Sequence, residues 1–385
     1  MILIINANIY TMAGKNYKNG CILIENNIIK KVSEKIEIKE EYKILDVKGA
    51  FVMPGIIDAH CHIGIMEESM GFEGLDLNEA TEPITPELRA IDAINPFDES
   101  FKRAIKAGIT TVMTGPGSAN VIGGQFCIIK TNGVCVDDMV VKEPAAIKAA
   151  FGENPKRIYK SRKKSPTTRM AIAALLRETL IKCKDYKYKR YKSEKNNEYF
   201  QKDLKMESIL PVIDKKLPLK VHAHRADDIL TAIRIAKEFD IKITLDHCTE
   251  AHFIGKYIKE SGFPVIVGPS ITSKSKIETK NRNNKTAVEL NKIGIDFAIM
   301  TDHPVVPIEY LPISAGLMVR EGLPIEAALK AITINPAKIL GIDDKLGSIE
   351  EGKEADISIF NGNPMQTLTN TLCTIIGGKI IYNNF

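Results

Sequence analysis

The sequence predicts an α/β protein organised around a parallel sheet. Its middle alternates apolar strands with amphipathic helices, and its two ends consist of short strands separated by turn residues. A third observation is the segment Ile56–His62, which has the pattern of a buried strand and ends in two histidines. Repeated strand–helix units with apolar strands indicate a parallel sheet covered by helices, and eight such units would close a (β/α)8 TIM barrel.

Length and composition fit a barrel with an accessory domain. The 385 residues are 44% hydrophobic and 26% charged, so they can bury a large core and exceed one small domain. We expect residues 54–342 to form the barrel. Residues 1–53 and 343–385 are expected to form one small β-sandwich domain from both termini.

Both ends of the chain have the composition of β-structure. Asn26-Asn27 and Gly377-Gly378 are typical of hairpin turns between short apolar strands. The strands expected here are Ile2–Ile9, Cys21–Glu25, Ile28–Val32, Lys43–Val47, Ala355–Phe360, Thr371–Ile376 and Lys379–Tyr382.

The barrel units follow one another from residue 56 onward. The first expected helix ends at Gly108, a residue that favours the left-handed conformation after a helix. The segments Gln125–Lys130 and Val134–Lys142 predict a β-hairpin inserted into the barrel. The other expected strands are Ile109–Thr114, Val221–Ala223, Lys242–Asp246, Phe263–Gly268 and Phe297–Thr301, and the helices are Phe97–Ala107, Asp227–Phe239, Ala287–Ile293, Pro324–Thr333 and Asn335–Leu340.

The stretch Lys182–Lys205 is strongly basic and rich in tyrosine. It allows two interpretations, a patch for nucleic acid or another anionic surface, and a long solvated helix that protrudes from the barrel. We favour the helix, because acidic residues such as Asp185 and Glu194 dilute the charge.

The cysteines, the N-terminus and the net charge together predict a cytoplasmic protein. Seven cysteines without paired spacing favour a reducing compartment over a disulfide framework. The N-terminus has the pattern of a strand rather than a signal peptide, and no apolar run approaches the ~20 residues of a membrane helix. The net charge of +5 is small against 53 basic and 48 acidic residues. We therefore expect a small-molecule substrate, no nucleic acid and no membrane partner; a homo-oligomer is compatible with the sequence.

His60 and His62 are the first candidate metal ligands. On a strand, residues i and i+2 point to the same face, so the two imidazoles would project together. Two imidazoles one pleat apart can hold one divalent transition metal. For an isolated His-x-His, simple hydrogen bonding would be the better interpretation, but this chain supplies further donors.

Three further donors close later strands: His222, His247 and Asp302. In a barrel, the carboxyl ends of the strands converge on one face, so these side chains would meet the first pair. Imidazole and carboxylate together suit zinc, iron, nickel or manganese. We expect a divalent metal, with zinc as the first candidate, as one or two ions.

The order of these residues resembles a known family. P-G-hydrophobic-hydrophobic-D-x-H-x-H, two later strand-end histidines and a late Thr-Asp-His resemble the amidohydrolase superfamily of metal-dependent hydrolases, near its imidazolonepropionase-like and dipeptidase-like members. The resemblance runs from the first strand to the last. It implies that His222, rather than His224, is the ligand of its pair, and that His224 faces the substrate. The ligand set it implies is His60, His62, His222, His247 and Asp302.

A two-metal site would need a bridging anion, because two dications a few ångströms apart repel strongly. The resemblance implies either a carboxylated lysine or a glutamate and leaves the choice open. We favour Glu153, which follows a short apolar run and precedes Pro155. The lysine alternatives are Lys130 and Lys142.

The ligand set implies a reaction. Metal-bound water has its pKa lowered to about 7, and the resulting hydroxide would attack an amide-type C–N bond of a non-peptide compound or a dipeptide. Asp302 would take the proton of the water and pass it to the leaving nitrogen. A deaminase of a nitrogen heterocycle would use nearly the same ligands. A non-catalytic scaffold would be expected to lose Asp302, which this chain keeps.

Overall fold

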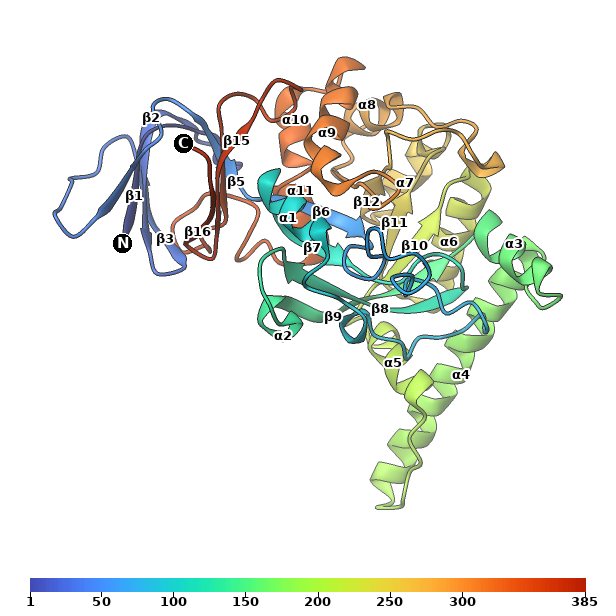
Figure 1. Cartoon of the computed structure of the whole chain (residues 1–385). Coiled ribbons are helices and arrows are strands. Elements are labelled where there is room, and N and C mark those ends of the chain that lie inside the picture. Colours follow the sequence, from blue (N-terminus) through green and yellow to red (C-terminus); the bar gives the residue numbers. More distant parts are fainter.

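The computed structural model describes residues 1–385 and contains two sheets of eight strands each (Figure 1). Strands from the middle of the chain form a nearly closed, largely parallel barrel. Strands from the two ends form the second sheet, which lies at one side of the barrel in Figure 1. The predicted fold class, an α/β barrel with a small β-domain from both termini, is confirmed.

The barrel sheet follows the order of the chain from β6 to β13. The pair β6–β7 and the five strands β9 to β13 are parallel, so the carboxyl ends of these strands share one face of the barrel. The strands are β6 (Ile56–Cys61), β7 (Ile109–Thr114), β8 (Ile122–Lys130), β9 (Val140–Ala150), β10 (Leu219–Ala223), β11 (Ile243–His247), β12 (Val265–Val267) and β13 (Phe297–Ile299).

Strand β8 is antiparallel to both of its neighbours, β7 and β9. The predicted hairpin of Gln125–Lys130 and Val134–Lys142 is present, because β8 and β9 pair antiparallel, with Ile128 opposite Lys142. Its prediction as an insertion is wrong, because β8 and β9 are the third and fourth strands of the barrel. Residues 122–129 are all buried, as expected of a strand paired on both edges rather than of a protruding ribbon.

Helices cover the outside of the barrel, and a cluster of 63 buried residues packs between the helices and the strands. A separate cluster of 14 buried residues, which includes Phe126 and Ile266, lies on the inner face of the barrel. The longest helix expected in a barrel unit, Asp227–Phe239, is α6 and ends at Phe239 as predicted; the next residue, Asp240, has the left-handed conformation. None of the helices has the length and apolar character needed to cross a membrane. The helices are α1 (Glu99–Lys106), α2 (Val136–Met139), α3 (Glu153–Ser161), α4 (Arg169–Lys195), α5 (Leu204–Ile213), α6 (Ala226–Phe239), α7 (Gly255–Ser261), α8 (Lys285–Lys292), α9 (Leu311–Arg320), α10 (Ile325–Lys330) and α11 (Ile334–Leu340).

The terminal sheet has its own core of 15 buried residues. Its strand β5 joins the barrel strand β6 through Gly55 alone, so the two sheets are connected directly below the histidine pair. A Cβ at position 55 would lie 2.2 Å from Thr110 Oγ1, and only glycine fits there. The strands are β1 (Ile2–Ile9), β2 (Tyr17–Glu25), β3 (Ile28–Ser33), β4 (Lys43–Asp46), β5 (Phe51–Pro54), β14 (Ile357–Phe360), β15 (Thr371–Ile376) and β16 (Lys379–Asn383).

The basic stretch Lys182–Lys205 lies at the end of a helical hairpin that extends away from the barrel (Figure 1). One long helix was predicted over the whole of Lys182–Lys205. In the structure α4 ends at Lys195, and residues 196–203 lead back to α5. Tyr186 fastens the two helices: its side chain is buried, stacks edge-on against Phe200 and donates to Glu207.

We expect the exposed lysines of this hairpin to be dispensable. Replacing Lys189 and Lys195 with glutamine should change the free energy of unfolding by less than about 0.5 kcal/mol, because both side chains are exposed and unpaired. Tyr186→Ala should cost about 2–4 kcal/mol through lost packing. Denaturant unfolding measures both, and activity should survive the lysine changes. A large loss of activity in the lysine variant would instead place this stretch near the substrate.

Candidate metal centre

Three barrel strands carry histidines to the same end of the sheet. His60 belongs to β6, and His62 follows it directly. His222 lies in β10 with His224 just beyond, and His247 is the last residue of β11. All five side chains are buried. The i, i+2 spacing within each pair thus puts both imidazoles on the same side of its strand, as the strand geometry requires.

The metal-binding side chains form two adjoining groups. Within each group, one ligand-capable atom per residue lies within 4.8 Å of the others. The rings of His60 and His247 join the groups, with centroids 5.5 Å apart. One group comprises His60, His62 and Asp302, and the other comprises His222, His224 and His247.

The first pair of histidines is held in one tautomer. The Nδ1 of His60 donates to Asp246 Oδ2 at 2.6 Å, and the Nδ1 of His62 donates to the carbonyl of Gly115 at 2.6 Å. Carbonyl and carboxylate oxygens only accept, so in both rings the Nε2 retains its lone pair. Asp246 is itself fixed by Lys220 Nζ at 3.0 Å. An imidazole anchored through one nitrogen and open at the other is the usual arrangement of a metal ligand.

The second group also offers nitrogens that fit a metal. His247 Nδ1 donates to the carbonyl of Gly268 at 3.1 Å, which leaves its Nε2 with the lone pair. This Nε2 and the Nδ1 of His222 are buried and have no hydrogen-bond partner. Burial holds the pKa of His60, His222, His224 and His247 well below the ordinary value. Neutral imidazoles with open nitrogens fit a divalent transition metal.

Asp302 completes the first group from the opposite edge of the barrel sheet. It lies three residues after β13, and its Oδ1 is 3.2 Å from His62 Nε2 and 3.5 Å from His60 Nε2. Its backbone N donates to the carbonyl of His60, and the neighbouring Thr301 N donates to the buried Asp58. Its φ of 55° is left-handed, a conformation that only such surrounding contacts maintain.

Lys148 is a buried residue of the site that the sequence reasoning missed. It lies on β9 with no exposed surface, and its Nζ is 3.3 Å from His60 Nε2. Burial lowers the pKa of Lys148 to about 8. A lysine in the middle of the apolar run Ala145–Phe151 was the signal that could have identified it, because lysine is rarely buried without a function or a partner.

The three residues predicted as bridges lie elsewhere. Glu153 is the first residue of α3, where its carboxylate accepts a hydrogen bond from the backbone of Glu278, and it belongs to neither donor group. Lys130 pairs with Asp356 at 2.8 Å beside the terminal sheet. Lys142 donates to a carbonyl at the end of α11. The prediction treated β8 and β9 as an insertion, whereas both belong to the barrel sheet, and β9 carries Lys148 to the site.

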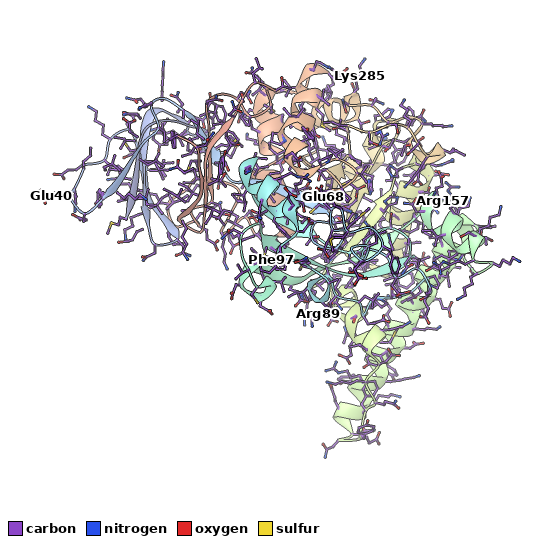
Figure 2. All side chains as sticks on the ribbon, viewed as in Figure 1. Glu40, Glu68, Arg89, Phe97, Arg157 and Lys285 are labelled. Atoms are coloured by element: carbon purple, nitrogen blue, oxygen red, sulfur yellow. The ribbon has the colours of Figure 1, made fainter.

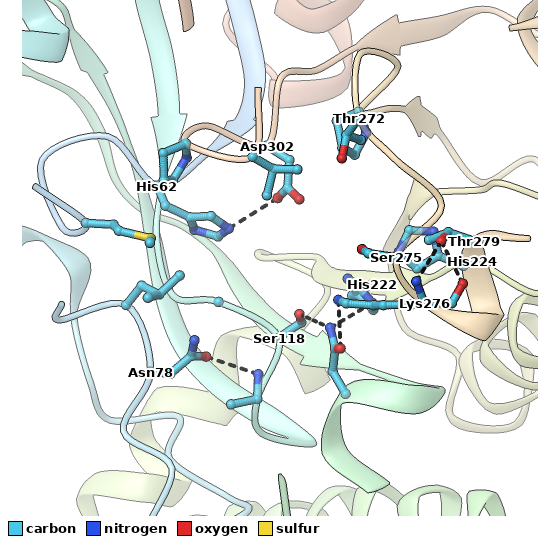
Figure 3. Close-up of a pocket in the computed structure, with 18 of the residues that line it drawn as sticks. His62, Asn78, Ser118, His222, His224, Thr272, Ser275, Lys276, Thr279 and Asp302 are labelled. Atoms are coloured by element: carbon cyan, nitrogen blue, oxygen red, sulfur yellow. Dashed lines mark hydrogen bonds and ion pairs between the residues drawn. The ribbon is translucent and has the colours of Figure 1, made fainter. Parts of the chain in front are cut away.

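The donor groups open into a pocket of about 410 Å³, shown in Figure 3. His62, His222, His224 and Asp302 line it, so the predicted substrate-facing residue His224 borders the pocket and also belongs to the second donor group. Asn154 borders it too, with its side-chain nitrogen 3.4 Å from His222 Nε2.

Glu278 approaches the second donor group from outside the barrel strands. It is buried in the loop after β12, and its Oε1 has no hydrogen-bond partner. This oxygen lies 3.6 Å from His222 Nε2 and 3.9 Å from His224 Nε2. No sequence pattern marked Glu278, because a long irregular loop brings it to the site.

A barrel with histidines at its strand ends and an aspartate after the last strand defines the class of barrel hydrolases that the sequence resembles. A family model described as "Amidohydrolase family" matches residues 51–381. The chain therefore belongs to the amidohydrolase family and is a hydrolase acting on C–N bonds. Members of this superfamily typically bind a divalent metal, in agreement with the donor groups.

Individual relatives agree with this assignment. The crystal structure of an amidohydrolase from Thermotoga maritima MSB8 is 43% identical, with a TM-score of 0.97 over 100% of both chains. Amidohydrolase tasK of Hapsidospora irregularis is 28% identical over 90% of this chain, which spans 38% of that longer protein. The imidazolonepropionase of Picrophilus torridus is 27% identical over 90% of this chain and 87% of its own.

We expect protein purified without chelator to contain about one or two transition-metal ions per chain, as the two donor groups allow. His247→Ala should lose most of the metal bound by the second group. His252→Ala is the matched control, because His252 contacts Thr286 and belongs to neither group. Elemental analysis measures both. Wild-type protein that is metal-free and fully active would contradict the assignment.

Proposed function

We propose that this chain is a metal-dependent hydrolase that cleaves an amide-type C–N bond in a small molecule. The observation that carries the proposal is the pair of adjoining donor groups at the mouth of one pocket. The residues proposed to hold one or two ions are His60, His62, His222, His247 and Asp302. Neutral imidazoles with one carboxylate favour zinc, and elemental analysis distinguishes it from iron, nickel or manganese.

We further propose that Lys148, rather than Glu153, supplies the bridge in a two-metal centre. Its Nζ lies 3.3 Å from His60 Nε2, whereas the Glu153 carboxylate is bound to the Glu278 backbone. An ammonium at position 148 would repel a metal held by His60. Reaction of the neutral amine with carbon dioxide would form a carbamate and release a proton. The carbamate is an anion, so it would attract metal ions in the two donor groups instead of repelling them.

The reaction joins one water to the substrate and releases an acid and an amine. A divalent ion bound here would lower the pKa of a coordinated water to about 7 and polarise the substrate carbonyl. Asp302 accepts the proton of the attacking water and transfers it to the leaving nitrogen, because its carboxylate borders the pocket. His224 borders the same pocket and orients the substrate.

Glu278 and Asn154 hold His222 in position for this reaction. The unpartnered Oε1 of Glu278 lies 3.6 Å from His222 Nε2 and could accept a proton carried there, which would leave Nδ1 open for a metal. The Asn154 amide nitrogen donates to Ser118 Oγ at 2.8 Å and packs against the same edge of the His222 ring at 3.4 Å.

Asp302→Asn should lower kcat by at least about 100-fold while the fold survives, because the amide keeps the shape but accepts no proton from water. Steady-state kinetics with a panel of amides, cyclic amides and dipeptides measures the loss. The same panel should contain amino-substituted heterocycles, and turnover of these alone would favour the deaminase alternative. Near-native turnover in the variant would exclude Asp302 as the base.

Lys148→Met should reduce the metal content and abolish activity, whereas Glu153→Gln should change both little. Elemental analysis and kinetics of the two variants make the comparison, and added bicarbonate should stimulate the wild type if carbamate formation limits activity. The reverse pattern would give the bridge to Glu153. One metal per chain with both variants unaffected would mean a site without a bridge.

A further inference from the structure

Basic side chains outnumber carboxylates in the lining of the pocket beside the donor groups. Its lining contains three basic side chains, Arg157, Lys276 and Arg282, but only one carboxylate, Asp302. No carboxylate oxygen lies within 4.0 Å of the side-chain nitrogens of the three basic residues. Most other buried or half-buried cations of this chain are paired, as Lys130 is with Asp356. The pocket is therefore electrostatically suited to an anionic ligand.

Lys276 is the basic residue best placed to contact such a ligand. It is half-buried in the loop after β12, and in Figure 3 it lies across the opening from His62 and Asp302. Its Nζ donates to Asn154 Oδ1 at 2.8 Å. An ammonium carries three donor hydrogens, so this contact fixes the group and leaves others for a ligand.

Lys276 is also connected to the donor groups. The Asn154 side chain that accepts from Lys276 approaches His222 Nε2 to 3.4 Å through its nitrogen. One amide side chain thus separates the ammonium from a proposed metal ligand. In an N-acyl amino acid or a dipeptide, the carboxylate carbon is two covalent bonds from the scissile nitrogen. The carboxylate of such a substrate is therefore also close to the bond that would be cleaved.

Arg282 and Arg157 strengthen the positive field around Lys276. Arg282 is half-buried, and its guanidinium donates to the carbonyls of Thr272 and Ser273, which holds the loop over the pocket. Burial without an acidic partner lowers the pKa of Arg282. Arg157 comes from α3 at the rim and is labelled in Figure 2.

We propose that the substrate is an amide bearing a carboxylate close to the scissile nitrogen, an N-acyl amino acid or a dipeptide, and that Lys276 binds this carboxylate. The inference rests on the proposed amide hydrolysis at the same site. Lys276 acts as a specificity residue and takes no part in holding the metal.

The test measures the kinetics of the metal-loaded enzyme with N-acetyl amino acids and dipeptides. Each compound is used in two forms, one with a free carboxylate and one with a C-terminal carboxamide in its place. The wild type should prefer the carboxylate form. Lys276→Gln should raise KM for that form by about 10- to 100-fold, the effect expected from losing a hydrogen bond to a charged group. KM for the carboxamide should stay nearly unchanged, and Lys276→Arg should retain most of the preference.

The matched control is Lys274→Gln, which removes an exposed lysine of the same loop that does not line the pocket. It should behave as the wild type, and the metal content of all variants should be equal. Equal use of both substrate forms by the wild type, or an equal loss for both in Lys276→Gln, would overturn the inference.

A binding measurement separates this inference from the proposed reaction. Uncleavable ketomethylene analogues, with the amide NH replaced by CH2, are titrated calorimetrically with and without the terminal carboxylate. Tighter binding of the acid, lost in Lys276→Gln, supports the inference even if no amide is hydrolysed, in which case only the proposed reaction fails. Equal binding of the two analogues, or binding of neither, overturns it.

Discussion

The hydrogen bonds that close the barrel beyond β13 also assemble the candidate site. Thr301 N donates to Asp58, and Asp302 N donates to the carbonyl of His60, so the last strand is fastened to the first at the level of the histidines. These bonds bring a carboxylate from residue 302 within 3.2 Å of His62. A chain that failed to close here would separate one proposed ligand from the others.

A second constraint is the balance of charge inside the barrel. Lys148 and Lys220 are fully buried on neighbouring strands, and only Asp246 pairs directly with one of them. One or two metal dications would add to this positive charge. Conversion of Lys148 to a carbamate would supply a negative charge that compensates the metal ions. The unpaired basic side chains of the pocket are a separate group, which lines the proposed substrate site.

The fold and the pattern of the site followed from the sequence where local rules apply. Apolar strands ending in His60, His222 and His247 were predictable, because strand alternation and the shared carboxyl face of parallel strands fix where such side chains meet. The end of α6 at Phe239 was also predictable, because the pattern of apolar residues along the helix stops there.

The rest depended on long-range pairing that the sequence does not display. The antiparallel strand β8 was interpreted as half of an inserted hairpin. It is buried on both faces, so its sequence shows no alternation of apolar and polar residues, and nothing in it indicates which strands lie beside it. That error directed attention to Glu153 and away from Lys148. Glu278 and Lys276 reach the site from an irregular loop, whose path is set by tertiary contacts rather than by local propensity.

The most direct test of the account is the position of the metal itself. Crystals of zinc-loaded protein, measured on both sides of the zinc absorption edge, would locate each ion by its anomalous signal. The account predicts one peak among His60, His62 and Asp302 and, if two ions bind, a second beside His222 and His247, with density continuing from Lys148 between them. Zinc bound only outside these two groups would contradict it.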